Sequence, residues 1–484
     1  MRRVVLTLFL CGLAACGERL PADFVLREVN IVDVEAGQIL PKQDVAVLGN
    51  RITGITPAAS NQEYLAAVEV DASGQYLIPG LWDMHAHTYA DAEARTAFLP
   101  AFVAHGVTGI REMFADCYEA CAGSDGLSVT KLMEIRHPPA SMVQAWSDDV
   151  AAGKLVGPRI VRSSYVIAGA VENAWPSSRV VEGIADARDA VLQSAERDVD
   201  FIKIYDDLGR DEFFEIARVA DSLSLPVAGH VPLSVTPEEA SEAGMDSFEH
   251  LLRLASYCVR DPGEAGPGAE DWNGAERLRN LASPQECLGT FSTMARNGTH
   301  IVPTLVVLGA YANIRALSDP ADPRRRYLPA HILELWDSRS RDEALTDAVL
   351  AYLDAIHDAA AALVPVAHGA GVQVLAGSDT PNPYVYPGSG LHDELEELVR
   401  AGLSPLDALR AATLNPARYF DALDSLGTVE AGKLADLVLL EANPLDEIGN
   451  TRRIEAVIAN GRLFDRARLD DVLASIQDHA EDMK

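Results

Sequence analysis

The feature of this 484-residue sequence that most constrains its fold is a series of apolar, β-rich runs that alternate with helical stretches between about Tyr76 and Leu423. Near-continuous apolar runs are typical of parallel strands buried on both faces, and parallel strands need long crossover connections such as helices. Eight such runs predict an α/β fold whose larger unit is a (β/α)₈ TIM barrel. They are residues 77–85, 106–113, 157–167, 201–205, 226–231, 247–251, 300–308 and 372–379.

Both ends of the chain predict a second, smaller β domain. Short β runs fill residues 22–70, where a Gly49-Asn50 turn suits a hairpin, and similar runs return near the end with Asn460-Gly461 as the turn. We therefore expect one β-sandwich built from both ends around the barrel. The predicted boundaries are 16–75 and 426–470 for its two parts, 76–425 for the barrel and 471–484 for a C-terminal tail.

The first residues predict export. Arg2 and Arg3 precede an apolar run that is too short to span a membrane, which is the pattern of a secretory signal peptide over residues 1–15. The sequence LAAC at 13–16 resembles the bacterial lipobox, which implies lipidation of Cys16 and anchoring in the cell envelope, facing the periplasm or the exterior. The alternative is an ordinary cleaved signal with an incidental cysteine.

Four cysteines remain once Cys11 leaves with the signal segment and Cys16 is lipidated, and an even number in an oxidising compartment predicts disulfides. We expect Cys117 to pair with Cys121 and Cys258 with Cys287. A cysteine metal site is the weaker interpretation, because the sequence has no Cys-x-x-Cys pair.

The charge balance argues against polyanionic partners. The sequence holds 72 acidic and 40 basic residues, for a formal net charge of -32 at pH 7. A chain this acidic repels nucleic acid phosphates and anionic lipid surfaces. We expect a small-molecule substrate, no nucleic acid partner and contact with a membrane through the lipid anchor only, and the sequence leaves a homo-oligomer open.

Metal-ligand side chains lie in or at the ends of five predicted barrel strands, and barrel enzymes carry their active sites at the carboxyl ends of the strands. Imidazole and carboxylate ligands without thiolate suit zinc, and less selectively manganese, iron or cobalt. His85 and His87 can bind one ion together, because alternate residues of a strand point to the same side. Each residue alone has an ordinary structural explanation, so the joint pattern carries the prediction. The set is His85, His87, Lys203, His230, His250 and Asp379.

Lys203 needs neutralisation, because a charged ammonium on an apolar strand is costly to bury and cannot bind a metal. One route is a depressed pKa, as in a Schiff-base lysine. The other is reaction with carbon dioxide to a carbamate, whose two oxygens can bridge two cations. The histidines and the aspartate around Lys203 favour the bridging carbamate.

The order His-x-His, Lys, His, His, Asp on predicted strands one, four, five, six and eight resembles the amidohydrolase superfamily. The likeness covers nearly the whole exported chain and indicates the imidazolonepropionase- and prolidase-like branch of binuclear metal-dependent hydrolases. It also implies the split β domain. The segments that carry it are YLIPGLWDMHAH, GVTGIRE, GPRI, DFIKIYDD, PVAGHV, SFEHL, LAGSDT, ELEELVRAGLSPLDALRAATLNPA and LGTVEAGKLADLVLLEANPL.

The resemblance implies two divalent metal ions, expected to be Zn²⁺, and carbon dioxide held as a carbamate on Lys203. A hydroxide that bridges the metals would attack the substrate carbonyl, and Asp379 would act as general base and general acid toward the leaving amine. The implied ligands are His85, His87 and Asp379 for one metal, His230 and His250 for the second, and carboxylated Lys203 between them.

Substrate recognition is where the sequence departs from the family pattern. Dipeptidases of this branch tend to carry Gly-Gly-His after strand three and a Tyr after the histidine of strand five, whereas this chain has VIAGAVENAW and GHVPLS. Tyr205, Arg111 and Tyr165 are candidate substrate contacts. Packing or a structural ion pair explains each of the three equally well.

The leading hypothesis is a lipid-anchored, metal-dependent amidohydrolase acting on the C–N bond of a small amide, such as a dipeptide or an N-acyl amino acid. The first alternative keeps the metal site but cleaves a cyclic amide, lactone or ester. A second has one metal and an unmodified Lys203, as in deaminase-like relatives. A non-catalytic envelope ligand-binding lipoprotein is disfavoured, because all six ligand positions are filled.

Overall fold

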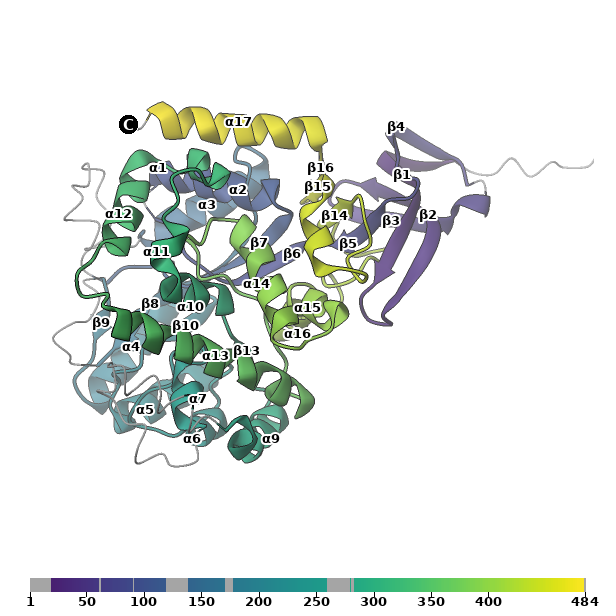
Figure 1. The fold of residues 1–484 in the computed structure, drawn as a ribbon. Coiled ribbons are helices and arrows are strands. Elements are labelled where there is room, and N and C mark those ends of the chain that lie inside the picture. Colours follow the sequence, from purple (N-terminus) through teal and green to yellow (C-terminus); the bar gives the residue numbers. More distant parts are fainter. Residues whose placement is uncertain are drawn as a thin grey trace, which may run out of the picture.

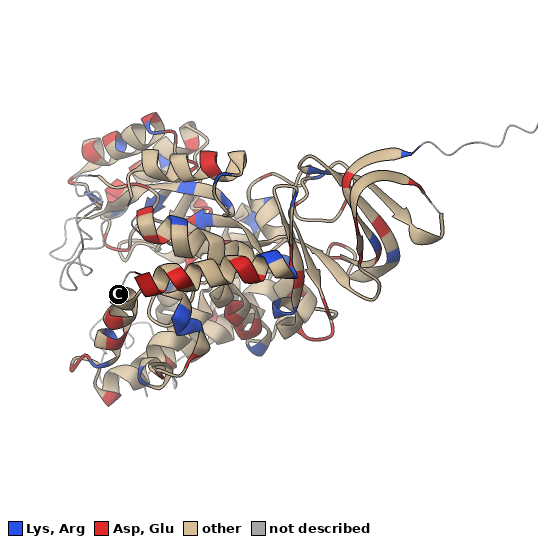
Figure 2. Cartoon of the chain, turned by 90° about the horizontal axis from the view of Figure 1, so that it is seen from above, with Lys and Arg blue, Asp and Glu red and all other residues tan. Residues whose placement is uncertain are grey.

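The computed structural model describes residues 19–60, 62–89, 91–118, 138–169, 177–258, 279 and 283–482. Their strands form two eight-stranded sheets, one inside a ring of helices and one beside it (Figure 1). Acidic and basic residues are interspersed along the outer helices (Figure 2). The signal segment, Cys16 and Cys121 lie outside the described residues, so the expectations about them stay predictions.

The first sheet is the barrel, and every pairing in it is parallel. Residues 373–380 lie between its first and last strands, through parallel bridges from Val374 to Ile301 and from Thr380 to Ala86. The eighth predicted run therefore closes the barrel. In sheet order the strands are β6 (Leu81–Ala86), β7 (Val107–Glu112), β8 (Arg159–Ala168), β10 (Phe201–Ile204), β11 (Val227–Gly229), β12 (Ser247–Glu249) and β13 (His300–Val302), with β9 (Arg179–Val180) on β8.

Helices surround this sheet, and their ends follow local sequence signals. Ser404 caps α15 by accepting the Asp407 N–H, and Gly402 adopts a φ of 118° just after α14. The helices are α1 (Asp91–Glu93), α2 (Leu99–Ala104), α3 (Ala140–Ala152), α4 (Ile184–Glu196), α5 (Arg210–Ser222), α6 (Pro237–Glu242), α7 (Leu252–Tyr257), α9 (Leu288–Asn297), α10 (Leu305–Ala312), α11 (Ile314–Leu317), α12 (Ala330–Ser340), α13 (Asp347–Gly369), α14 (Ser389–Arg400), α15 (Pro405–Ala411) and α16 (Leu414–Tyr419).

By length and composition, α13 is the one helix in the described part of the chain that could cross a membrane. Its residues Ala360, Leu363 and Val364 instead pack into the hydrophobic core around the barrel. This packing is typical of a long core helix.

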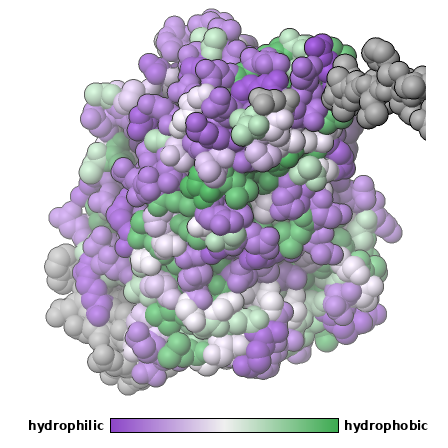
Figure 3. All heavy atoms as spheres, turned by 90° about the vertical axis from the view of Figure 1, so that its right-hand side faces the viewer, coloured by the Kyte–Doolittle hydropathy of each residue, from purple (hydrophilic) through white to green (hydrophobic). Residues whose placement is uncertain are grey.

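The second sheet joins both ends of the chain. Its order is β16-β15-β14-β5-β1-β2-β3, with β4 paired to β1, so the described strands form one continuous sheet and the two-sheet sandwich stays a prediction. Leu40, Leu65 and Val68 of this sheet are exposed, and Figure 3 shows apolar atoms among hydrophilic ones on this side. The strands are β1 (Leu20–Asp33), β2 (Gln38–Leu48), β3 (Arg51–Pro57), β4 (Tyr64–Asp71), β5 (Tyr76–Pro79), β14 (Leu437–Leu440), β15 (Ile454–Ala459) and β16 (Arg462–Asp465).

Three sequence-based expectations need correction. The first run divides at Gly80 into β5 of the second sheet and β6 of the barrel, and a Cβ at Gly80 would lie 2.0 Å from Thr108 Oγ1. The seventh run is a strand only to Val302, because Thr304 is left-handed (φ 47°) and starts α10. The expected tail at 471–484 lies mostly in α17 (Arg466–Asp482), which packs against α2.

A disulfide joins Cys258, at the end of α7, to Cys287 before α9, with a Cα–Cα distance of 5.3 Å. We predict that the double variant Cys258→Ser/Cys287→Ser loses about 3–4 kcal/mol of unfolding free energy, because a cross-link over a loop of this length restricts the unfolded chain. Urea denaturation of the oxidised proteins measures the loss. Wild-type protein and variant should have the same midpoint once both are treated with dithiothreitol, and an unchanged midpoint in the oxidised variant would contradict the prediction.

Candidate metal centre

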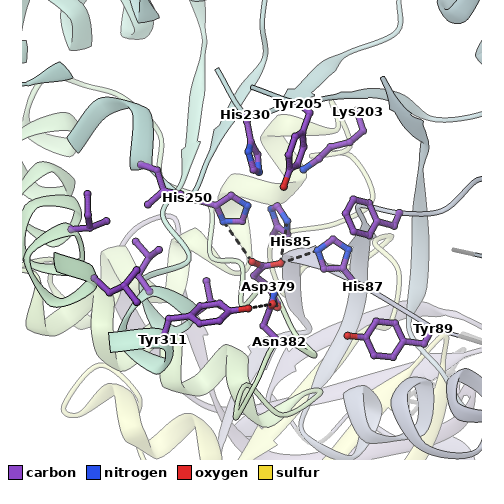
Figure 4. Close-up of a pocket in the computed structure, with 16 residues that line it drawn as sticks. His85, His87, Tyr89, Lys203, Tyr205, His230, His250, Tyr311, Asp379 and Asn382 are labelled. Carbon is purple, nitrogen blue, oxygen red and sulfur yellow. Dashed lines mark hydrogen bonds and ion pairs between the residues drawn. The ribbon is translucent and has the colours of Figure 1, made fainter. Parts of the chain in front are cut away.

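The six predicted ligands surround one cavity of about 300 Å³ at the carboxyl ends of the barrel strands (Figure 4). Five of them come from a strand or from the residue that follows it, and Asp379 comes from residues 373–380, which join the barrel through two isolated bridges. His250 and Asp379 hold positive φ angles of 63° and 58°, which non-glycine residues adopt rarely and which are concentrated at functional sites. The structure therefore brings together His85 and His87 from β6 and its end, Lys203 from β10, His230 after β11, His250 after β12 and Asp379 from residues 373–380.

The Asp379 carboxylate lies at the centre of the group. Its Oδ1 is 2.8 Å from His87 Nε2 and 3.4 Å from His85 Nε2. Its Oδ2 is 3.7 Å from His250 Nδ1. Donor atoms of His85, His250 and Asp379 all lie within 4.8 Å of one another, which suits a set that surrounds a metal ion. Burial alone would raise the pKa of Asp379, but the neighbouring histidines and Lys203 lower it below its ordinary value.

A hydrogen bond to Glu249, on the side away from the cavity, sets the orientation of the His85 ring. Its Nδ1 lies 2.7 Å from Glu249 Oε2. Because an ionised carboxylate only accepts hydrogen bonds, Nδ1 carries the proton and the Nε2 lone pair faces the cavity. The other Glu249 oxygen accepts from Arg111 at 2.7 Å, and both side chains are fully buried. Hydrogen bonds of this kind to the second nitrogen of a histidine are common behind metal ligands.

The donor set fits a metal ion. The buried His87 Nδ1 has no hydrogen-bond partner among the described residues, and Glu112 Oε1 stands 3.9 Å from it. Burial lowers the pKa of His85 well below its ordinary value and that of His250 to about 3, so both imidazoles are neutral at pH 7. Neutral imidazole is the form that binds metals.

Lys203 is buried in β10 and lines the same cavity. Burial is the main cause that lowers the pKa of its amine to about 8. A share of the amine is therefore uncharged near neutral pH, as reaction with carbon dioxide requires.

His230 adjoins Tyr205 and His250. Its ring stacks on Tyr205 at 4.2 Å between centroids and meets the His250 ring edge-on at 4.8 Å. Its Nδ1 is 3.7 Å from Asp206 Oδ2. The four imidazoles thus follow one another around the cavity, because the His250 ring is also 4.5 Å from that of His85.

The three candidate substrate contacts have different outcomes. Tyr205 lines the cavity. Arg111 does not line the cavity. It is fully buried and donates to Glu249, Ser247 and the Met84 carbonyl, so it forms a structural ion pair with Glu249. Tyr165 does not line the cavity either, because its hydroxyl donates to the Ala190 carbonyl at 2.6 Å inside the core.

Sequence reasoning missed Glu249, Tyr311 and Asn382. Glu249 directly precedes His250 in SFEHL, so its position beside a ligand was a usable signal. Tyr311 and Asn382 both line the cavity, and the Tyr311 hydroxyl donates to Asn382 Oδ1 at 2.9 Å. No sequence pattern marked this pair, because α10 and residue 382 meet only in the fold.

This chain is similar in sequence to several known proteins. An adenine deaminase of Rubrobacter xylanophilus is 24% identical over 455 residues, which cover 92% of this chain and 57% of that protein. Ochratoxinase of Aspergillus niger is 23% identical over 481 residues, covering 90% and 87%. The chain spans between 18% and 57% of the length of the adenine deaminases that it matches.

Among solved structures, a bottromycin amidohydrolase superposes with a TM-score of 0.73 at 25% identity, over 94% of this chain and 90% of the other. The model of the amidohydrolase family matches residues 76–464, which include the whole barrel and all six ligand positions. The chain therefore belongs to the amidohydrolase family, and the amidohydrolase superfamily is metal-dependent.

Proposed function

We propose that this protein is a metal-dependent amidohydrolase that hydrolyses the amide bond of a small substrate, such as a dipeptide or an N-acyl amino acid. One observation carries the proposal: three histidines converge on the buried Asp379 carboxylate, and the lysine of β10 lines the same cavity. Cleavage of a cyclic amide, lactone or ester is the alternative on the same site.

The ligands would divide between two divalent cations, with Zn²⁺ the best match to imidazole and carboxylate donors. A bound cation lowers the pKa of water to about 7 and polarises a carbonyl group. We propose His85, His87 and Asp379 for one cation, His230 and His250 for the other, and a carbamate of Lys203 between them. The burial of Lys203 beside these ligands supports this assignment.

Asp379 would transfer a proton from water to the leaving amine. Its pKa is lowered, so the carboxylate is ionised at neutral pH and can accept a proton from water at Oδ1 or Oδ2. The hydroxide oxygen that remains bonds to the carbonyl carbon, and the leaving amine nitrogen takes the proton from Asp379 as the C–N bond breaks.

We also propose that the protein is an exported lipoprotein, attached to the envelope through lipidated Cys16. The Cys258–Cys287 disulfide supports an oxidising compartment.

We predict that the mature protein contains about two equivalents of transition metal and that Lys203→Met contains one or fewer, because the bridging ligand is lost. Elemental mass spectrometry of protein purified without chelator measures both. Lys154→Met is the control, since Lys154 is an exposed surface lysine. Two equivalents in Lys203→Met would contradict the bridge, and one equivalent in the wild type would favour the deaminase-like centre.

We expect Asp379→Asn to lower kcat by about 10²- to 10⁴-fold, because the amide cannot accept the proton from water. The assay uses whichever amide in a panel of dipeptides and N-acyl amino acids the wild type cleaves. Asp198→Asn serves as the matched control, because the Asp198 side chain is fully exposed. Full activity in Asp379→Asn would remove Asp379 from the reaction.

Glu249→Gln should weaken metal affinity by roughly 10- to 100-fold, because the carboxylate that orients His85 is lost. Competition with a chelator measures the affinity, and thermal unfolding shows whether the loss of the Arg111 ion pair also destabilises the fold. Glu196→Gln, at an exposed position of α4, is the control. Unchanged affinity in a folded Glu249→Gln variant would show that Glu249 does not position the ligand.

A further inference from the structure

One wall of the cavity is apolar. Figure 4 shows aliphatic side chains beside His250 and Tyr311, away from Lys203 and His230. We propose that this apolar wall binds a bulky uncharged group of the substrate, on one side of the scissile bond. The inference rests on the proposed function and adds the substrate class to it. The apolar wall comes from α7, α10 and α13 and consists of Leu252, Val307, Leu308, Leu353 and Ile356.

Hydrogen bonds at both ends of α10 connect this helix to the proposed metal ligands and so fix the place of its apolar side chains. At its start, Thr304 Oγ1 is 2.8 Å from His250 Nδ1. At its end, Tyr311 donates to Asn382 Oδ1 at 2.9 Å, and Asn382 Nδ2 donates to the Asp379 carbonyl at 2.7 Å. Val307 and Leu308 lie between these two ties.

The N-terminus of α10 has a third support. The Val306 N–H donates to a carboxyl oxygen of Glu394, a fully buried residue of α14, at 2.8 Å. Burial raises the pKa of Glu394 to about 8, so this support is a hydrogen bond to one of the free N–H groups at the helix N-terminus and not a charge interaction. The α10 part of the apolar wall is therefore held in place by hydrogen bonds, which favours selection of a shape over adaptation to many.

The size of the cavity suits an amide that carries one large group. A cavity of 150 Å³ lined by aliphatic and aromatic residues is large enough for benzene. The volume here is about 300 Å³, which leaves space for a scissile amide beside a group of about that size.

The distribution of charged groups around the cavity also favours an uncharged substrate group at the apolar wall. Among the described lining residues, the cationic and anionic groups are those of the candidate centre, and the apolar wall has none. Placing a charged group there would leave it unpaired at a desolvation cost, whereas an apolar group gains by leaving water.

Two amide series test the inference on the purified holoprotein. In N-acyl alanines the acyl chain grows from acetyl to octanoyl, and in N-acetyl alkylamines the amine chain grows instead. We expect kcat/KM to rise about fourfold per added methylene in one series until the cavity is full, since a buried methylene contributes about 0.8 kcal/mol.

Leu353→Ala should lower kcat/KM on the longest good substrate by about tenfold, mainly through KM, and leave the acetyl compound within twofold. Leu353 is half-buried on α13, so the shortened side chain is compatible with folding. Leu192→Ala is the matched control, because Leu192 is an exposed leucine of α4. Leu353→Trp narrows the cavity and should shift the preference to shorter chains.

Binding of octanamide, measured by calorimetry beside acetamide, separates the two proposals. If octanamide binds and Leu353→Ala weakens it while no amide is cleaved, the apolar wall is supported and the proposed hydrolysis fails. If amides are cleaved with rates independent of chain length in both series, the hydrolase stands and the apolar wall is overturned. Absence of both octanamide binding and chain-length dependence also overturns it.

Discussion

Closure of the barrel between β6 and residues 373–380 is the constraint on which the site depends. The Asp379 N–H donates to the His85 carbonyl at 2.7 Å, and the His87 N–H donates to the Thr380 carbonyl at 2.8 Å. Below them, Asp83 accepts hydrogen bonds from the Ser378 hydroxyl and N–H. These bonds bring residues nearly 300 positions apart in sequence into one register, so His85 and His87, at the end of the first strand, meet Asp379 of residues 373–380.

The buried Arg111–Glu249 pair extends this register across the barrel. Arg111 belongs to β7, yet it donates to the Met84 carbonyl of β6 and to Ser247 and Glu249 of β12. A buried ion pair adds little net stability, because desolvation offsets the attraction. Its value here is geometric: it holds one Glu249 oxygen, and the other then sets the ring of His85. Removing one partner would leave a buried charge unpaired, so the pair acts as a unit.

The sequence predicts that the six candidate residues lie around one cavity because their positions are a property of the backbone. A residue at the carboxyl end of a buried parallel strand faces the same rim whatever its neighbours are, so the places of His230 and His250 follow from the predicted strands, whereas their role as ligands stays a prediction. Side-chain direction is not fixed in this way. Arg111 and Tyr165 lie on β7 and β8 as expected, but their functional groups reach buried partners away from the cavity. The apolar run at 305–308 fits a strand or a helix equally well, and the left-handed Thr304 decides for the helix.

The proposed metal ligands and the proposed substrate wall therefore come from different parts of the fold. Five of the proposed ligands lie on strands or strand ends, where backbone hydrogen bonds leave little freedom, whereas the wall comes largely from α10 and α13 outside the sheet. Substitutions at Leu353 or Ile356 change the shape of the cavity and touch no ligand. The chemistry can stay constant while the substrate changes, and this explains why a sequence that specifies all six ligands says little about what is cleaved. In this chain the apolar side chains of α10 and α13 would determine which substrate fits the cavity.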